Sequence, residues 1–176
     1  EFISSFFSHS PKLDSIGEAL RQRKDFPTSN RAVLCEVLKD QYAELAAEHS
    51  VFESLEQLRD PNAFTVTTGQ QLVLGSGPLL VIYKAVQAVR LAADVQAQFP
   101  GHHILPVFWL ASEDHDFDEA DHFYFSDRRL SVQRSVAGSV GRTPLPDMDA
   151  ILHELEERMG QGKTQSRILA MLRSAY

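Results

Sequence analysis

Residues 64–125 of the 176-residue chain read FTVTTGQQLVLGSGPLLVIYKAVQAVRLAADVQAQFPGHHILPVFWLASEDHDFDEADHFYF. Its first five residues, 64–68, form a β-branched run that predicts a buried strand. Residues 104–111 (ILPVFWLA) are almost continuously apolar, which is typical of a strand covered on both faces. A helix that starts at Gly77-Pro78 and ends near Gln98 separates the two strands. This order predicts a βαβ unit with parallel strands.

One side of the predicted helix carries an apolar stripe at spacings of three and four, formed by Leu79, Ile82, Val86, Val89 and Ala93. Lys84 falls opposite this stripe, which predicts a lysine in solvent. Tyr83 and Lys84 also lie within two turns of the helix start, so they could instead point toward a ligand held there. Trp109, late in the second strand, is either a core residue or part of a pocket wall.

Helices are also predicted on both sides of the βαβ unit. In residues 12–59, Cys35 lies on a helical apolar stripe with Leu38, Tyr42 and Leu45, which indicates a core side chain and not a reactive thiol. Residues 123–125 and 130–134 predict a hairpin, and residues 148–159 and 163–172 predict two more helices. We therefore expect three parts: N-terminal helices at 1–60, a core with the active site at 61–137, and a connecting loop with helices at 138–176.

Charge and composition narrow the class of protein. The net charge is −7, but six carboxylates lie in residues 113–121, so the rest of the chain carries −1. Without a stripe of Lys and Arg, nucleic acid is not an expected partner. A single cysteine excludes an internal disulfide and fits a reducing compartment. No apolar run is long enough to span a membrane, and residues at the start of the sequence lack the basic-then-apolar order of a signal peptide, so we expect a cytoplasmic protein that does not bind membranes.

The chain begins at Glu1 without an initiator Met and stops at Tyr176 within a predicted helix. We therefore expect it to be a part of a longer protein, with further domains elsewhere. Whether such a part folds by itself depends on how much apolar surface the other domains cover.

Glycines and glutamines follow the first strand. Gly69-Gln70-Gln71 is expected to turn the chain, and Gly75-Ser76-Gly77 precedes the helix. Flexible backbone and exposed amides beside a helix start favour an anionic group such as a phosphate or carboxylate, although a purely structural turn is the alternative. The dinucleotide fingerprint is absent because Leu80 stands where its last glycine is required, and there is no phosphate loop.

The acidic segment after the second strand allows three interpretations. It could be a solvated loop, or a metal site formed by His115, Asp116, Asp118 and His122, although it matches neither the calcium loop nor HExxH. The interpretation that we favour is recognition of a cationic substrate group with acid–base help. A carboxylate such as Asp114 can hold an ammonium, and His115 can accept a proton near neutral pH.

Several of these motifs together resemble the bacillithiol biosynthesis cysteine-adding enzyme family. The resemblance rests on residues 67–71 (TTGQQ), 77–79 (GPL), 82–84 (IYK), 106–109 (PVFW) and 113–119 (EDHDFDE), and it covers about the first third of that family's length. It implies an α/β fold with a Rossmann-like, three-layer parallel-sheet core and an N-terminal helical segment. In the family, further connecting elements and a C-terminal coiled coil, through which the protein forms a homodimer, complete the enzyme.

The resemblance also implies an activity. Family members are ligases that join the carboxyl group of L-cysteine to the amino group of glucosaminyl malate, which yields the thiol bacillithiol. Amide formation from a free carboxylate is uphill, so we expect ATP as an activating co-substrate, and we expect the chain by itself to be inactive. A more distant similarity to class I aminoacyl-tRNA synthetases relates Gly77-Pro78-Leu79 to their signature helix start, without its two histidines, and relates residues 113–116 to an acidic element that holds the ammonium of an amino acid.

The expected site follows from these patterns. The residues expected to be catalytic are Asp114 and His115. The residues expected to bind substrate are Thr68, Gly69, Gln70, Gln71, Gly77, Tyr83, Lys84, Trp109, Glu113, Asp116 and Asp118, and no resident metal is expected. Two other functions remain open: a non-catalytic small-molecule or nucleotide-binding module on the same fold, and a metal-dependent hydrolase that uses residues 113–121.

Overall fold

The computed structural model describes residues 7–10, 12–23, 25–43, 45, 48–132, 138–145 and 147–176. The chain divides into two compact units. Unit 1 consists of Glu1–Thr68 and Val86–Val107, and unit 2 consists of Gly69–Ala85 and Phe108–Tyr176. Both strands of the βαβ motif, and the helix between them, contribute residues to both units.

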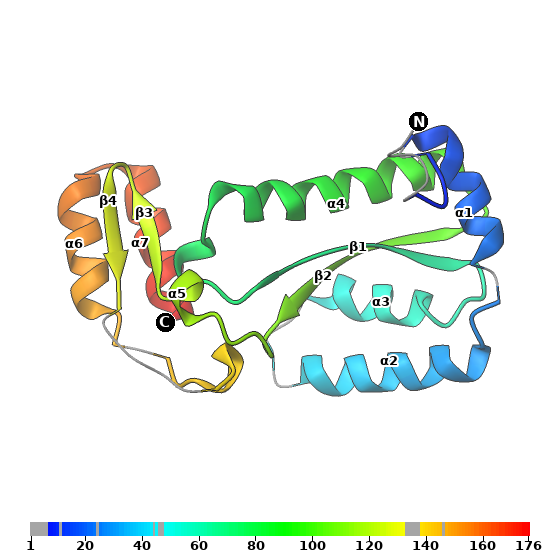
Figure 1. The fold of residues 1–176 in the computed structure, drawn as a ribbon, viewed down its shortest axis with the longest axis horizontal. Helices are drawn as coiled ribbons and strands as arrows, with labels where there is room; N and C mark the ends of the chain where they lie inside the picture. Colours follow the sequence, from blue (N-terminus) through cyan, green and yellow to red (C-terminus); the bar gives the residue numbers. More distant parts are fainter. Residues whose placement is uncertain are drawn as a thin grey trace. The chain divides into compact units, whose positions relative to one another are not determined.

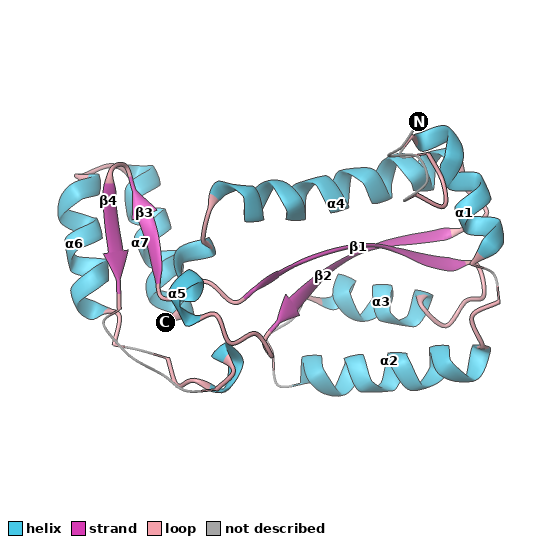
Figure 2. Cartoon of the chain, viewed as in Figure 1, coloured by secondary structure: helices cyan, strands magenta, loops and turns pink. Residues whose placement is uncertain are grey.

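Strands β1 (Ala63–Gln71) and β2 (His103–Ala111) form a two-stranded sheet. At their starts, the backbone N–H of His103 donates to the carbonyl of Asn62 at 3.1 Å. Near their ends, Gly69 lies against the backbone of Trp109. Because like ends of the strands are neighbours, the strands are parallel, and helix α4 (Leu79–Gln98) connects them (Figure 2). The βαβ unit predicted from the sequence is confirmed.

Helices cover both faces of the strands in unit 1 (Figure 1). One face carries α1 (Ile16–Gln22), which follows a short 3₁₀ turn (Leu13–Ser15), and the later part of α4. The other face carries α2 (Thr28–Ala43) and α3 (His49–Gln57). Adjacent residues of β2 point to opposite faces of the sheet. Ile104 packs with Leu20 and Val95 on one face. Leu105 packs with Cys35 and Leu55 on the other face. Unit 1 is therefore a three-layer α/β arrangement.

The later half of β2 differs from the sequence expectation. Ile104 and Leu105 are buried, as predicted for a strand covered on both faces, but Trp109 and Leu110 are 60% and 58% exposed. The two buried residues of β2, Ile104 and Leu105, belong to the apolar clusters of unit 1. Uniform apolarity along the strand therefore does not correspond to uniform burial.

Helix α4 packs through a face other than the predicted one. Its buried residues are Ala88, Ala92 and Val95. The stripe predicted from periodicity is exposed; for example, Leu79 is 63% and Val86 59% exposed. Small alanine side chains allow α4 to lie close to the residues that it packs against. Close packing therefore decides which face of the helix is buried more strongly than the hydrophobicity of that face does. Lys84 is half-buried on the same face as Ala88, so the prediction of a lysine in solvent is wrong.

The segment between β1 and α4 also differs in detail. Gly69, Gln70 and Gln71 belong to β1, so the predicted turn at these residues is wrong. The strand continues because Gly69 has no side chain where a Cβ would lie 2.7 Å from the carbonyl oxygen of Trp109. The chain turns later, in a 3₁₀ segment (Leu74–Ser76), and Gly75, Ser76 and Gly77 all have positive φ.

Unit 2 contains a hairpin, a short helix and a helix pair. Strands β3 (His122–Phe125) and β4 (Arg128–Ser131) are antiparallel, with Phe123 paired to Leu130. Helix α5 (Phe117–Ala120) precedes the hairpin, and a 3₁₀ turn η4 (Val140–Arg142), α6 (Asp149–Met159) and α7 (Lys163–Ala175) follow it. The predicted hairpin and both helices are confirmed, whereas the expected extension of the second strand to residues 133 and 134 lies outside the described residues.

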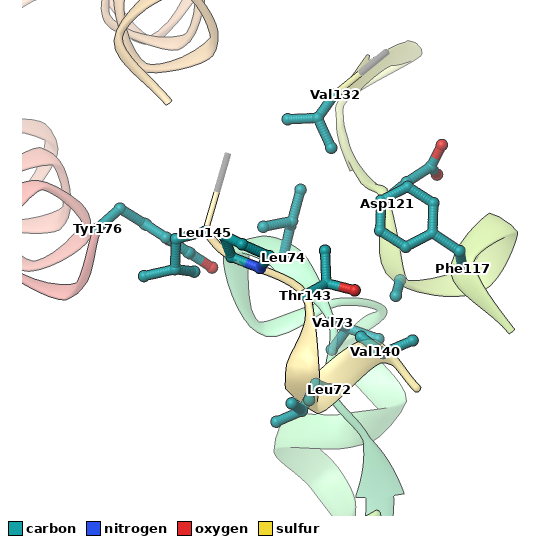
Figure 3. A pocket seen from close by; sticks show the side chains of 13 residues that line it. Leu72, Val73, Leu74, Phe117, Asp121, Val132, Val140, Thr143, Leu145 and Tyr176 are labelled. Atoms are coloured by element: carbon teal, nitrogen blue, oxygen red, sulfur yellow. The ribbon is translucent and has the colours of Figure 1, made fainter. Parts of the chain in front are cut away.

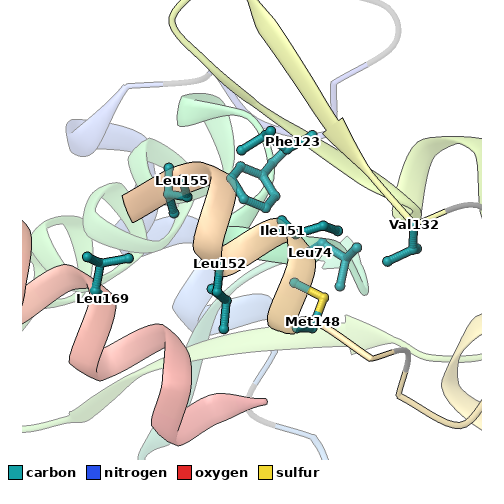
Figure 4. Close-up of a cluster of buried hydrophobic side chains, with 9 residues drawn as sticks. Leu74, Phe123, Val132, Met148, Ile151, Leu152, Leu155 and Leu169 are labelled. Carbon is teal, nitrogen blue, oxygen red and sulfur yellow. The ribbon is translucent and has the colours of Figure 1, made fainter. Parts of the chain in front are cut away.

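One apolar cluster holds unit 2 together (Figure 4). Phe123 and Leu130 of the hairpin pack with Leu152 and Leu155 of α6 and with Leu169 of α7. Leu74, from the 3₁₀ turn after β1, joins the same cluster. The turn that precedes α4 is thereby fixed to the hairpin, and the ends of the two parallel strands lie in the same unit as the acidic segment.

Cys35 is fully buried, and its thiol donates to the carbonyl of Leu55 at 3.2 Å. Burial raises the pKa of the Cys35 thiol, which disfavours the reactive thiolate. The prediction of a core cysteine is confirmed, although Leu45 of the same stripe is 60% exposed. No helix in the described parts of the chain is long and apolar enough to cross a membrane.

Candidate functional site

The expected site residues, with the exception of Thr68, all belong to unit 2. Thr68 is half-buried in β1 and belongs to unit 1. The others follow or occupy the carboxyl ends of β1 and β2, or lie in the first turns of α4. Open α/β sheets bind ligands at this edge, because strand ends and helix starts converge there.

A chain of hydrogen bonds connects the end of β1 to the acidic segment. Lys84 Nζ donates to Gln70 Oε1 at 3.1 Å, the Gln70 amide donates to Gln71 Oε1, and the Gln71 amide donates to Glu119 Oε2. Each amide accepts on one side and donates on the other, so its orientation is fixed. A cation and a carboxylate are thereby connected through two glutamines.

These glutamines line a cavity of about 540 Å³, which we call the glutamine pocket. Its lining consists of Gln70, Gln71, Val73, Gly77, Pro78, Leu79, Glu119, His122, Phe123 and Tyr124. Its polar side-chain groups are therefore two amides, one carboxylate, one imidazole and one phenol hydroxyl. The structure brings together Gln70, Gln71 and Gly77 of the expected site, and it adds Glu119 and His122.

Glu113 and His115 line a different cavity, of about 710 Å³, which we call the histidine pocket. The other lining residues are Ser112, Gly138, Ser139, Gly141, Arg142, Thr143 and Pro144. A carboxylate, an imidazole and a guanidinium thus face one cavity, whose size lies within the range of about 300–1,000 Å³ common for ligand sites. Such a set can bind an anion and an ammonium, and the imidazole can transfer a proton.

Backbone hydrogen bonds fix the loop that closes the histidine pocket. The N–H of Val140 donates to the carbonyl of Asp114 at 2.7 Å, and the N–H of Gly141 donates to the carbonyl of Ser112 at 2.8 Å. A Cβ at Gly141 would lie 2.5 Å from the Cβ of Ser112, so only glycine allows this approach. The pocket is therefore built from two segments held in a defined register.

Asp114 and Asp116 shape the acidic segment. Asp114 Oδ1 accepts the N–H of Asp116 at 2.9 Å, and Asp116 Oδ1 accepts the N–H of Glu119 at 3.1 Å as the N-cap of α5. Asp118 is exposed in the first turn of α5. None of these three side chains lines either the glutamine pocket or the histidine pocket. The expected contacts of these carboxylates with substrate stay predictions.

Two aromatic residues of the expected site are exposed. Tyr83 is 65% exposed on α4, and Trp109 is 60% exposed on β2. Neither residue lines the glutamine pocket or the histidine pocket. The prediction that Trp109 is a core residue is therefore wrong, because its indole is exposed. Its backbone nevertheless packs tightly against Gly69.

An apolar cavity of about 330 Å³ adjoins the histidine pocket and shares Gly141, Thr143 and Pro144 with it (Figure 3). Its side chains include Leu72, Leu74, Phe117, Val132, Val140 and Tyr176. The Tyr176 hydroxyl accepts a hydrogen bond from the N–H of Gly75 at 2.9 Å. This bond fixes the Tyr176 side chain to the turn before α4. Sequence reasoning missed this cavity, because its lining comes from five separate segments.

Sequence reasoning also missed a polar cluster at the start of the hairpin. Asp121 Oδ1 lies 2.8 Å from His122 Nδ1 and accepts from Arg129 at 3.1 Å. The hairpin register could have revealed it, since Arg129 pairs with Tyr124, whose side chain shares a face with His122. Across the described ranges, no group of three or more His, Cys, Asp or Glu side chains is arranged to hold a metal ion.

Comparisons with known proteins agree with this architecture. The protein family described as "Bacillithiol biosynthesis BshC, N-terminal Rossmann-like domain" matches residues 1–176 of the chain. Proteins named "Putative cysteine ligase BshC" are similar along the chain. The protein from Flavobacterium johnsoniae is 29% identical over 99% of the chain and 33% of its own length. The protein from Cytophaga hutchinsonii is 34% identical over 89% of the chain and 30% of its own length. The protein from Koribacter versatilis is 33% identical over 99% of the chain and 35% of its own length.

The chain spans about a third of the length of these curated relatives. The match covers both units, including the two strands and the acidic segment that motivated the expected family. The α/β, Rossmann-like fold expected from the sequence is confirmed. The chain therefore belongs to the bacillithiol biosynthesis BshC family and corresponds to its N-terminal Rossmann-like domain.

Proposed function

We propose that the chain forms the Rossmann-like part of a cysteine ligase, which joins the carboxyl group of L-cysteine to the amino group of glucosaminyl malate and yields bacillithiol. The observation that carries this proposal is the family match over all 176 residues. The name that the similar proteins share, "Putative cysteine ligase BshC", supports the reaction class. In this proposal the parent enzyme performs the reaction, and this chain supplies the site at the ends of β1 and β2.

The histidine pocket fits the nucleophilic half of this reaction. The amino group of a glucosamine is mostly protonated near neutral pH, and it must lose a proton before it attacks a carbonyl carbon. In our proposal His115 accepts that proton, and Glu113 holds the ammonium before transfer. Asp114 uses Oδ1 for the backbone of Asp116, and its second oxygen is the one that would contact an ammonium.

The carboxyl half of the reaction requires activation, since a carboxylate oxygen is a poor leaving group. We propose that ATP supplies it: a carboxylate oxygen of cysteine attacks a phosphorus atom of ATP, and a phosphoanhydride bond breaks with release of ADP or pyrophosphate. The amine then attacks the resulting mixed anhydride, and phosphate or AMP departs. The glutamine pocket is the candidate position for the anionic groups of this co-substrate. The amides of Gln70 and Gln71, which line the pocket, are its potential donors, and Lys84 contacts Gln70.

The proposal extends to partners and location. We propose a cytoplasmic enzyme with only small-molecule substrates, without nucleic acid or membrane partners. We also propose that the parent enzyme is a homodimer through a coiled coil outside this chain. These points rest on the family resemblance and on the absence of a basic stripe in the sequence.

The test is direct. The parent enzyme is incubated with L-cysteine and glucosaminyl malate, with and without ATP, and bacillithiol is measured by mass spectrometry. Product that forms only with ATP is the expected result, and ADP or AMP released in equal amount identifies the bond of ATP that is broken. No product under any condition, together with saturable binding of either substrate, would favour a non-catalytic binding module on the same fold.

A further inference from the structure

We propose that Arg142 binds the malyl carboxylates of glucosaminyl malate and thereby selects this substrate. This inference rests on the proposed function, because it assigns one end of the proposed substrate to one wall of the histidine pocket. Arg142 ends the 3₁₀ turn η4 and lines the histidine pocket with Glu113 and His115. It had no role in the sequence expectations, where residues 138–146 were only a connection.

Most arginines in the described part of unit 2 form ion pairs; Arg142 and Arg167 do not, and of these two Arg142 lines the histidine pocket. Arg128 and Arg158 pair with Glu154, Arg129 pairs with Asp121, and Arg173 pairs with Glu156. Among the residues that the structure describes, no carboxylate pairs with the guanidinium of Arg142. A guanidinium that lines a cavity and has no carboxylate partner in the protein presents its paired N–H donors to an anion in that cavity.

The backbone of Arg142 is well supported. The two residues before it donate their N–H groups to Asp114 and Ser112, on either side of Glu113. The N–H of Arg142 itself donates to the carbonyl of Ser139 at 3.1 Å. These bonds couple the position of Arg142 to the segment that carries Glu113 and His115. An arginine on a supported turn loses less freedom on binding than one on an unrestrained loop.

Substrate chemistry places a carboxylate near this arginine. In a glucosaminyl malate the amino group is on C2 of the sugar and the malyl group is on the adjacent C1. If His115 receives the amine proton, the malyl group must lie within a few bonds of the same place. Both malyl carboxylates are ionised at neutral pH, so the group is a dianion. Arg142 is the guanidinium of the cavity that His115 lines.

The other carboxylate in the reaction fits this position less well. The carboxylate of cysteine loses its charge when it becomes an acyl group. An arginine paired with it would stabilise the starting state more than the transition state, which slows the reaction. The malyl carboxylates keep their charge throughout, so their contact with arginine persists through the reaction. The malyl end is therefore the better partner for Arg142.

The test compares Arg142→Ala and Arg142→Lys with the unmodified parent enzyme. We expect Arg142→Ala to raise KM for glucosaminyl malate by about 10- to 100-fold, which is the range for a charged hydrogen-bonded pair, and to leave KM for cysteine unchanged. Arg142→Lys should give an intermediate KM, because lysine keeps the charge and loses the planar pair of donors. Methyl glucosaminide lacks the malyl group, so wild type and Arg142→Ala should use it equally.

Arg158→Ala is the matched control. Arg158 is also an exposed arginine of unit 2, but it pairs with Glu154 on α6, and its replacement should leave both KM values unchanged. An equal KM for glucosaminyl malate in wild type and Arg142→Ala would overturn the inference. So would an equal loss with methyl glucosaminide, because that loss would show a general disturbance of the loop.

Calorimetric binding of glucosaminyl malate separates this inference from the proposed function. If the parent enzyme forms no product but binds glucosaminyl malate, and Arg142→Ala weakens that binding at least 10-fold, the assignment of Arg142 stands and the ligase proposal fails. If bacillithiol forms and both proteins bind glucosaminyl malate equally, the ligase stands and the assignment fails. Absence of binding to the unmodified enzyme overturns the assignment as well.

Discussion

Unit 1 and unit 2 use the same two strands for different purposes. In unit 1, the first residues of β1 and β2 are packed between two apolar clusters, and the charged side chains of α2 and α3 mostly form ion pairs such as Lys39 with Glu56. In unit 2, β1 ends in two glutamines, and the segment after β2 carries carboxylates and a histidine; these residues line two cavities. The strand bodies provide stability, and the strand ends provide the candidate chemistry.

This contrast explains where substitutions should act. A polar group at a buried strand position such as Ile104 or Leu105 would be without a partner, which costs free energy. At the strand ends the backbone leaves the sheet, so side chains can face a cavity and still be supported by neighbouring loops. We therefore expect changes in unit 2 to affect activity and changes in unit 1 to affect stability.

The largest expected effect comes from His115→Ala in the parent enzyme. Loss of a general base should lower kcat by about 10²- to 10⁴-fold, because the attacking amine would then depend on water to remove its proton. The circular dichroism spectrum should not change, because His115 is exposed. His103→Ala in unit 1 is the control and should retain kcat. Equal kcat values for both variants would contradict the expectation that activity depends on unit 2 and not on unit 1.

The next largest effect distinguishes the apolar core of unit 2 from that of unit 1. Leu130 in unit 2 and Leu105 in unit 1 are both buried, so replacing either by alanine should destabilise the protein by about 2–5 kcal/mol. For Leu130→Ala, hydrogen exchange should increase first in β3, β4, α6 and α7, since their side chains share its cluster. For Leu105→Ala, it should increase first in α2 and α3. Uniform loss of protection in both variants would mean that the units unfold together.

A smaller effect is expected from Gly141→Ala. The new Cβ would lie 2.5 Å from Ser112 Cβ and 2.7 Å from its carbonyl oxygen, so the loop must move away from the histidine pocket. Such overpacking typically costs about 1–3 kcal/mol, and kcat/KM should fall with it. Gly101→Ala is the control, since a Cβ there meets nothing within 4 Å. Thermal unfolding and steady-state kinetics check both variants, and equal kinetics would show that the loop register is unimportant.

The smallest effect concerns an exposed pair of unit 1. The hydrogen bond from Lys39 lowers the pKa of Glu56 below its ordinary value of 4.5. A carboxylate with a lowered pKa stabilises the fold above its unfolded pKa, and this contribution is lost as the pH falls through the folded pKa. Glu56→Gln should barely change Tm at pH 7, because the pair is exposed. A double-mutant cycle with Lys39→Met checks this, and a large coupling at pH 7 would contradict it.

The sequence predicted some elements well because their signals are local. The hairpin at residues 122–131, helices α6 and α7, the boundaries of α4 and the core position of Cys35 all follow from periodicity and from turn residues. The acidic segment and the glutamines were recognised as unusual because polar residues directly follow strand residues. Their approach to a common edge of the sheet follows from the parallel order of the strands.

Other features required distant contacts. Whether Gln70 and Gln71 extend β1 or form a turn depends on the fit of Gly69 against Trp109. The face that α4 buries depends on close contact through Ala88 and Ala92, whereas the residues that make its predicted stripe are exposed. Periodicity shows that a helix has an apolar side, but it does not show which side a neighbouring layer reaches first.

The candidate site shows the same division. Residue types and strand order alone identified the family and the βαβ motif, and they predicted a role for Glu113 and His115, which line one pocket. The separation of the site into a glutamine pocket and a histidine pocket, and the presence of Arg142 in the second, came only from the folded chain. Local patterns reflect the backbone preferences of neighbouring residues, whereas the walls of a cavity depend on packing and hydrogen bonds between segments that are far apart along the chain.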